Sequence, residues 1–168
     1  METAAVSAIV QDLHILIGRL EEEHRSFATD IEGLGNAARG DGSSTSTLVV
    51  PFTALSDSLT EHMLVEESEV YPAVMAGGLF DPSVSSIMQQ HHDVAGSLSR
   101  MALALRNDGL GEFRIALEEL SSVLRVHQPA EEEKVFPLLV PDDAGSSSSE
   151  PPNIFGRNDK AAGVESGV

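Results

Sequence analysis

The stretch TEHMLVEESEVYP, residues 60–72, returns in altered form as RVHQPAEEEKVFP, residues 125–137. Both stretches contain a histidine followed four positions later by a glutamate, and both end on an aromatic residue and a proline. His62 and His127 are 65 positions apart, as are Glu66 and Glu131. Because residues four apart share one face of an α-helix, each stretch predicts a helix that carries an imidazole and a carboxylate side by side.

The repetition extends toward the N-terminus of both predicted helices. The apolar positions at helical spacing are Phe52, Leu55 and Leu59 before His62, and Leu117, Leu120 and Leu124 before His127. Beyond the glutamates, the next position on the same helix face is either Glu69 or Val70 in the first of these helices, and either Val135 or Lys134 in the second. The His–Glu pairs therefore occupy positions on the faces that turn toward the core.

A second repeat relates the two helices that precede these. Residues 17–34 align with residues 84–101 at a separation of 67 positions, so that His24 corresponds to His91. Each histidine lies among apolar-face residues: Ile17, Leu20, Phe27, Ile31 and Leu34 around His24, and Val84, Ile87, Val94, Leu98 and Met101 around His91. The chain is thus interpreted as two tandem helical hairpins, each with one histidine on its first helix and His-x-x-x-Glu on its second.

Turn-forming residues set the expected limits of the four helices. The first is predicted over about 3–36, and the polar stretch 39–47 is expected to be a flexible loop. The second is expected to begin near Pro51, and the third at Pro82 with Asp81 as its N-cap. Asn107-Asp108-Gly109 should end the third helix, and the fourth should begin near Gly111.

Four amphipathic helices of this kind predict an all-α fold, an up-down-up-down four-helix bundle over residues 1–140. Residues 141–168 are rich in Asp, Ser, Pro and Gly, and are predicted to form a flexible, disordered tail.

The charge balance excludes some classes of partner. The chain has 27 acidic and 10 basic residues, a formal net charge of −17. Such a surface repels the phosphates of nucleic acids and anionic membrane surfaces, so neither is an expected partner. Since no apolar run reaches the length of a membrane span and no secretory signal is evident, a cytoplasmic location is expected. The sequence does not predict the oligomeric state.

The repeated histidines and glutamates predict a metal site. With no cysteine in the chain, its ligands must be nitrogen and oxygen atoms. Burial of unpaired imidazoles and carboxylates costs several kcal/mol each, and two bound divalent cations would offset that cost. Imidazole and carboxylate suit iron and related transition metals, with the two glutamates bridging the ions. The candidate ligands are His24, His62, Glu66, His91, His127 and Glu131.

Other polar residues lie beside this set. His14 and His92 are one position off the apolar face, a rotation of about 100°, which predicts surface positions or contacts behind the ligands. Glu67 and Glu132 follow the ligand glutamates, and either remain exposed or pair with a neighbouring helix. Tyr71 either packs in the core or hydrogen-bonds into the site.

Four segments resemble the hemerythrin-like family, also described as HHE cation-binding domains: EEEHRSF (21–27), TEHMLVEESEVYP (60–72), QQHHDV (89–94) and RVHQPAEEEKVFP (125–137). The resemblance covers about residues 1–140. It implies two iron ions joined by an oxygen or hydroxide bridge, with the six candidate ligands around them. Ferritin-like bundles use Glu-x-x-His instead, which is not the spacing repeated here.

The chain departs from the family pattern in three ways. Oxygen-carrying hemerythrins have a fifth histidine ligand, which the core-facing positions of this sequence do not provide. Water, His14, His92, Glu67 or Tyr71 would take that coordination position here. Pro129 lies between His127 and Glu131 and should kink or loosen the helix. Family members that repair iron–sulfur centres have an additional cysteine-containing domain, and this sequence has no cysteine.

The expected function follows from the resemblance and from the apolar surroundings. An open coordination position beside Leu59, Phe27, Val94 and Leu124 would favour a small ligand such as O2, NO or H2O2. Oxygen binding or sensing is the first expectation. A diiron enzyme that detoxifies peroxide or NO, and an iron-responsive interaction module, are the alternatives.

Overall fold

The computed structural model describes residues 2–40, 42–76 and 82–139, with side chains from residue 11 onward except at residues 82 and 83. The predicted N-cap Asp81 and the predicted tail, residues 141–168, lie outside the described residues. The elements in chain order are α1 (Glu2–Arg39), α2 (Thr45–Val65), the π-helix η1 (Glu66–Val70), α3 (Tyr71–Ala76), α4 (Pro82–Arg106), α5 (Leu110–Lys134) and α6 (Phe136–Leu139).

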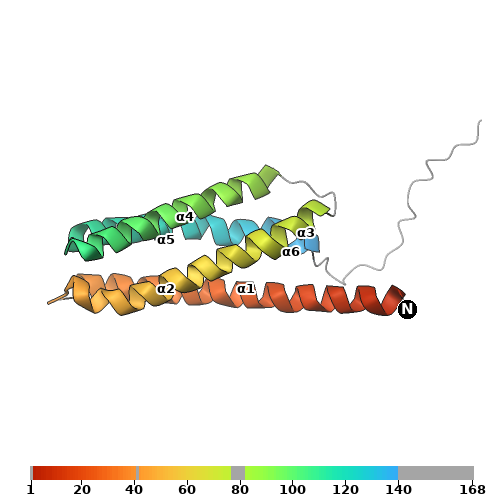
Figure 1. Cartoon of the computed structure of the whole chain (residues 1–168), viewed down its shortest axis with the longest axis horizontal. Helices are drawn as coiled ribbons and strands as arrows, with labels where there is room; N and C mark the ends of the chain where they lie inside the picture. Colours follow the sequence, from red (N-terminus) through yellow and green to blue (C-terminus); the bar gives the residue numbers. More distant parts are fainter. Residues whose placement is uncertain (1, 41, 77–81, 140–168) are drawn as a thin grey trace, which may run out of the picture.

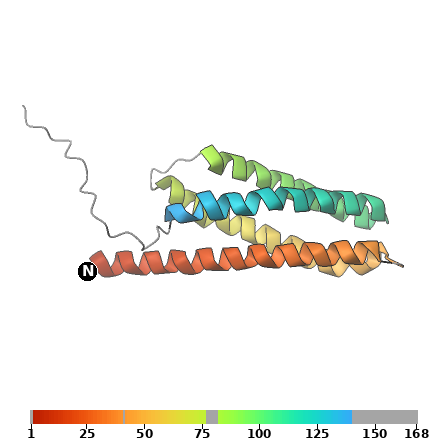
Figure 2. The same ribbon diagram turned by 180° about the vertical axis from the view of Figure 1, so that it is seen from behind.

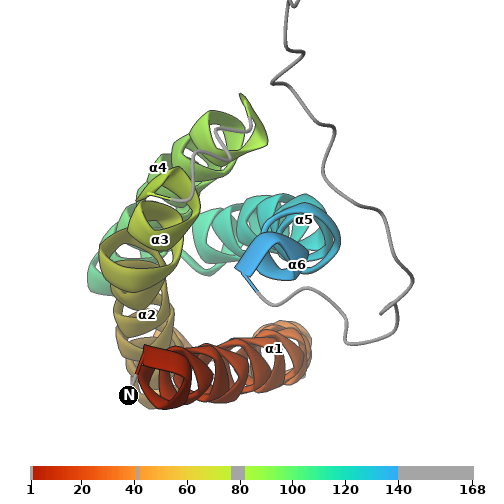
Figure 3. The ribbon, with the colours of Figure 1, turned by 90° about the vertical axis from the view of Figure 1, so that its right-hand side faces the viewer.

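These elements form four long rods, because α2, η1 and α3 continue one another, as do α5 and α6 around Val135 (Figure 1). The rods α1–α2 and α4–α5 are antiparallel hairpins, stacked one on the other (Figure 2). Additional contacts join α1 to α5 and α2 to α4, so the four rods surround a common axis (Figure 3). The predicted up-down-up-down bundle is confirmed.

The helix limits agree with the sequence except at the start of the second helix. That helix begins at Thr45, not near Pro51, so the predicted loop ends earlier than expected and Pro51 lies inside the helix. A tertiary contact explains the difference: Thr45 is buried, and its hydroxyl donates a hydrogen bond to Asp108 at 2.5 Å. Asp108 itself adopts a positive φ of 55° in the turn that ends α4, where the sequence predicted the end.

The core consists of two apolar clusters, one on each side of the predicted ligands. The larger contains Phe27, Leu59, Val94 and Leu124, the residues expected beside the site. The smaller is formed by Ile17, Leu20, Val70, Tyr71, Val74, Val84, Ile87, Val135 and Phe136. Val70 and Val135, rather than Glu69 and Lys134, therefore continue the apolar faces. The predicted ligands therefore lie between two packed apolar clusters.

Candidate metal centre

The six predicted ligands meet in the middle of the bundle. They form two groups that share both glutamates: His24, His62, Glu66 and Glu131, and Glu66, His91, His127 and Glu131. Within each group, one potential ligand atom per residue lies within 4.8 Å of all the others. The histidines are 1–3% exposed, and both glutamates are 0% exposed. We call His24 and His62 the first position, and His91 and His127 the second position.

Each helical rod contributes to this cluster. His24 comes from α1 and His91 from α4, while the two His–Glu pairs project from the rods α2–η1 and α5. Glu66 begins the widened π-helical turn, a local geometry often found at functional sites. Pro129 lies inside α5, which is helical from Leu110 to Lys134, and the kink or loosening expected at this residue stays a prediction. The His127 Nε2 atom remains 3.2 Å from Glu131 Oε2.

A hydrogen-bond partner outside the cluster fixes each imidazole. The Nδ1 atoms of three histidines contact carboxylate oxygens: His24 with Glu132 at 2.8 Å, His62 with Glu23 at 2.7 Å, and His91 with Glu67 at 2.8 Å. The Nδ1 of His127 contacts the amide oxygen of Gln90 at 3.3 Å. Because these oxygens accept, each Nδ1 donates its hydrogen, and a neutral imidazole then has a bare Nε2.

The bare Nε2 atoms point at one another and at the carboxylates. His24 Nε2 is 3.1 Å from His62 Nε2, and His62 Nε2 is 2.9 Å from Glu66 Oε1. The other oxygen of Glu66, Oε2, lies 3.3 Å from His91 Nε2, so this carboxylate directs one oxygen at each position. Three buried oxygens have no hydrogen-bond donor: Glu66 Oε1, Glu66 Oε2 and Glu131 Oε2.

Lone pairs that converge in a dry core repel each other unless a proton or a metal cation lies between them. The cluster provides imidazole nitrogens and carboxylate oxygens, and a hydrogen-bond partner holds each imidazole from behind. The two groups of potential ligands share the carboxylates of Glu66 and Glu131. These are the usual features of a transition-metal site and its supporting hydrogen bonds. The residues present therefore fit a metal centre.

The rings beside the two positions differ. The Tyr71 hydroxyl donates a 2.5 Å hydrogen bond to Glu131 Oε1 and lies 3.1 Å from His91 Nε2. Phe136 is the corresponding residue in the repeat, and its ring stacks on His24 with the centroids 6.0 Å apart. The sequence alternative in which Tyr71 hydrogen-bonds into the site is thus confirmed. Glu131 reaches His24 and His127 through its other oxygen, Oε2.

Burial and mutual charge alter the titration of the cluster. Burial, with the charge of Glu66, raises the pKa of Glu131 to about 7. Burial alone would raise the pKa of Glu66 too, but the imidazoles of His62 and His91 beside its oxygens hold that pKa below its usual range. Burial and neighbouring imidazoles lower the pKa of His127 to about 3. Burial also opposes the charged form of His62, but the carboxylates of Glu66 and Glu23 outweigh it and raise the pKa.

The structure also places the residues around the ligands. His14 and His92 are exposed, as their positions off the apolar face predicted, and His92 Nδ1 contacts the Met88 carbonyl. Glu67 and Glu132 pair with histidines of neighbouring helices, which was one of the two sequence alternatives.

Sequence reasoning missed Glu23 and Gln90 as partners of the ligands. From the sequence alone, the acidic run of residues 21–23 is predicted to be mainly a solvated face, yet Glu23 holds His62. Gln90 was not singled out. Both immediately precede a ligand histidine and are 67 positions apart, so the repeat already related them. The structure shows that this position on the first helix of a hairpin contacts the histidine on the second.

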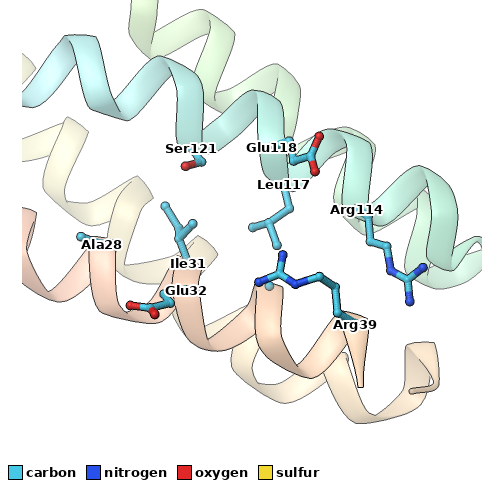
Figure 4. Close-up of a pocket in the computed structure, with 9 residues that line it drawn as sticks. Ala28, Ile31, Glu32, Arg39, Arg114, Leu117, Glu118 and Ser121 are labelled. Carbon is cyan, nitrogen blue, oxygen red and sulfur yellow. The ribbon is translucent and has the colours of Figure 1, made fainter. Parts of the chain in front are cut away.

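Two cavities include a candidate ligand, one lined by His62 with Glu23 and one lined by His91 with Glu67, and others lie away from the cluster. A cavity of about 290 Å³ lies between residues 28–39 of α1 and 114–121 of α5, with Arg39 reaching toward α5 (Figure 4). Arg114, at the edge of this cavity, donates to the Ala38 carbonyl and so caps the last turn of α1. Among the described residues, no helix combines the length and apolar character that a bilayer span requires.

No protein-family model, curated protein or solved structure matches this chain. The comparisons therefore assign no family. The geometry establishes a helical bundle with a buried His/Glu cluster that can hold a metal ion.

Proposed function

We propose that this chain is a hemerythrin-like, non-haem diiron protein that binds O2 at a carboxylate-bridged site in the bundle core. One observation supports the proposal above all: imidazole Nε2 atoms and carboxylate oxygens converge in two groups without donors between them. His24 and His62 would hold one ion, His91 and His127 the other, and Glu66 and Glu131 both. Iron bound there would supply the electrons that reversible O2 binding requires.

The surroundings favour a small, uncharged ligand. The cluster lies between two apolar groups of side chains, so that a charged or large organic molecule would lose its hydration without new partners. A cavity of about 290 Å³ between α2 and α4 is lined by Met63, Leu64, Glu67 and His91, among others. Its lining includes the apolar side chains of Met63, Leu64 and Ala95 and a candidate ligand histidine, which suits the entry of a diatomic molecule.

The Tyr71 hydroxyl adds a proton donor to the site. It already donates to Glu131 beside His91, in a part of the core with few other donors. This observation favours a second candidate function, the disproportionation of H2O2 to water and O2, in which one H2O2 is reduced and a second is oxidised, because reduction of the O–O bond to water requires protons at the departing oxygen. A carrier would bind one O2 per site and release it unchanged, whereas the enzyme would consume many molecules of H2O2.

The first experiment measures iron and absorption. Protein loaded anaerobically with Fe(II) should contain two irons per chain, and O2 should produce the visible absorption of a bridged diiron(III) centre that decays when O2 is removed. Protein without bound iron would refute the proposal. Iron-loaded protein that turns over H2O2 repeatedly with release of O2, and that forms no reversible O2 adduct, would replace it with the peroxide-decomposing function.

Two adjacent histidines provide a matched pair of variants. His91→Leu removes a ligand and should lower the iron content to one or none, whereas His92→Leu changes an exposed residue and should retain both irons. Circular dichroism checks that both variants remain helical. Equal iron contents in the two variants would contradict the predicted ligand set.

A further inference from the structure

The two halves of the cluster are related by the sequence repeat, but their supporting residues are not identical. At the first position, both imidazoles donate to carboxylates, Glu132 and Glu23. At the second, His91 donates to the carboxylate of Glu67, but His127 donates only to the neutral amide of Gln90. The first position therefore has one more negative charge in contact with its imidazoles.

A carboxylate behind a ligand imidazole makes the opposite nitrogen a stronger donor, and substitutions in this outer layer typically change metal affinity by 10–100-fold. His62 Nδ1 and Glu23 Oε2 are 2.7 Å apart, against 3.3 Å for His127 Nδ1 and Gln90 Oε1. Charge and distance thus both favour a cation at the first position.

The phenol opposes an ion at the second position independently. The single hydroxyl hydrogen of Tyr71 is donated to Glu131 Oε1, so its oxygen lies 3.1 Å from the bare Nε2 of His91. An ion that binds His91 must move this oxygen away, because it occupies the space in front of the His91 Nε2 atom. At the first position the corresponding ring belongs to Phe136, which has no hydroxyl and competes for nothing.

We infer that the two metal positions are inequivalent, with a tight ion between His24 and His62 and a weaker, exchangeable ion between His91 and His127. This inference rests on the proposed function, since it requires the metal centre. It means that a one-metal form exists over a range of metal concentrations, and that the metal supply controls whether the position beside Tyr71 is filled. The protein would gain its full, two-metal activity only above a threshold of free metal.

Single-position variants test the order of affinity directly. His127→Ala leaves the first position and His62→Ala leaves the second, and each is titrated with Co2+ at pH 8 while the visible absorption is recorded. We expect the Co2+ Kd of the His127→Ala protein to be at least 10-fold lower than that of the His62→Ala protein. Equal values, or the reverse order, would overturn the inference. If neither variant binds Co2+ but the unmodified protein binds two ions, the same comparison is made on the intact chain.

For the intact chain, crystals prepared with one equivalent of Co2+ give the occupancy of each position by anomalous scattering. The inference requires the His24–His62 position to be the more occupied, and equal occupancy refutes it. If the protein binds no Co2+ and no Fe2+ at all, the proposed metal centre itself fails. Two equal, independent sites instead refute only the inequivalence.

Exchanging the supporting residues tests the cause. Glu23→Gln should raise the Kd of the first position by about 10-fold or more, and Gln90→Glu should lower that of the second by a similar factor. The double variant should reduce or reverse the difference between positions. Affinities that do not respond to either exchange would show that Glu23 and Gln90 do not set the order.

Discussion

The first and second hairpins build their halves of the candidate metal centre from the same pattern, yet they differ at two outer positions. Glu23 in the first hairpin corresponds to Gln90 in the second, and Tyr71 corresponds to Phe136. The six candidate ligands and the supporting Glu67 and Glu132 are repeated without change, while the other two neighbours of the cluster are varied. The difference teaches that the repeat preserves what a cation requires, and that the properties of each position are adjusted through neighbours of its ligands.

Removal of metal affects both halves and should have the largest effect. An ion present at a thousandfold excess over its Kd stabilises the folded chain by about 4 kcal/mol, so two ions contribute about 8 kcal/mol. A chelator should then lower Tm by roughly 15–30 °C, measured by circular dichroism. With increasing chelator the transition should fall in two steps, the weaker second ion leaving first. An unchanged Tm would contradict metal binding in both halves.

The shared glutamates test whether the halves form one centre. Glu66→Ala and Glu131→Ala should each weaken metal binding by more than about 100-fold at one position or both, since even outer-layer substitutions cost 10–100-fold. Glu66→Ala should be the more damaging, because Glu66 directs one oxygen at each position. The control is Glu69→Ala, an exposed residue in the same π-helical turn. Metal content by mass spectrometry decides; two ions retained in Glu66→Ala would disprove bridging.

Tyr71→Phe removes one of the two differences between the halves. In the metal-free protein it deprives Glu131 Oε1 of its donor and should destabilise the fold by about 1.5–3 kcal/mol, measured by urea denaturation. In the metal-bound protein the phenol no longer competes at His91, so the second ion should bind more tightly. Opposite signs in these two measurements would identify Tyr71 as a positioning residue. Destabilisation with weaker metal binding would instead indicate that Tyr71 is a ligand.

Most of the fold could be predicted from the sequence because periodicity is a local property. The repeated spacing of apolar residues located all four rods, and turn chemistry at Asn107–Gly109 located the end of α4. The start of α2 could not be predicted, because Thr45 is helical through a contact with Asp108, a residue far along the chain. The π-helical turn at Glu66 likewise has no periodic signature.

The candidate site, like the fold, could be predicted from the sequence only in part. Helical phase predicted that six polar side chains face the core, and the structure brings all six together. Helical phase did not predict that Glu23 and Gln90 contact the histidines. Side chains at the edge of a helix face become partners only once the neighbouring helix is placed. Phase alone also left two readings for Glu67, exposed or paired, and the structure shows both at once: a half-exposed carboxylate that holds His91.

Glu67 and Glu132 provide the comparison with the smallest expected difference. Each is about 40% exposed, at 42% and 40%, and each accepts from a ligand Nδ1 at 2.8 Å across a hairpin boundary. Glu67→Gln and Glu132→Gln should both weaken metal binding at their own position, by similar factors of about 10. The two losses should agree within about 0.5 kcal/mol, as measured by Co2+ titration of the single-position variants. A large difference would mean that the asymmetry of the centre extends beyond Gln90 and Tyr71, because these two carboxylates are otherwise equivalent in distance, exposure and charge.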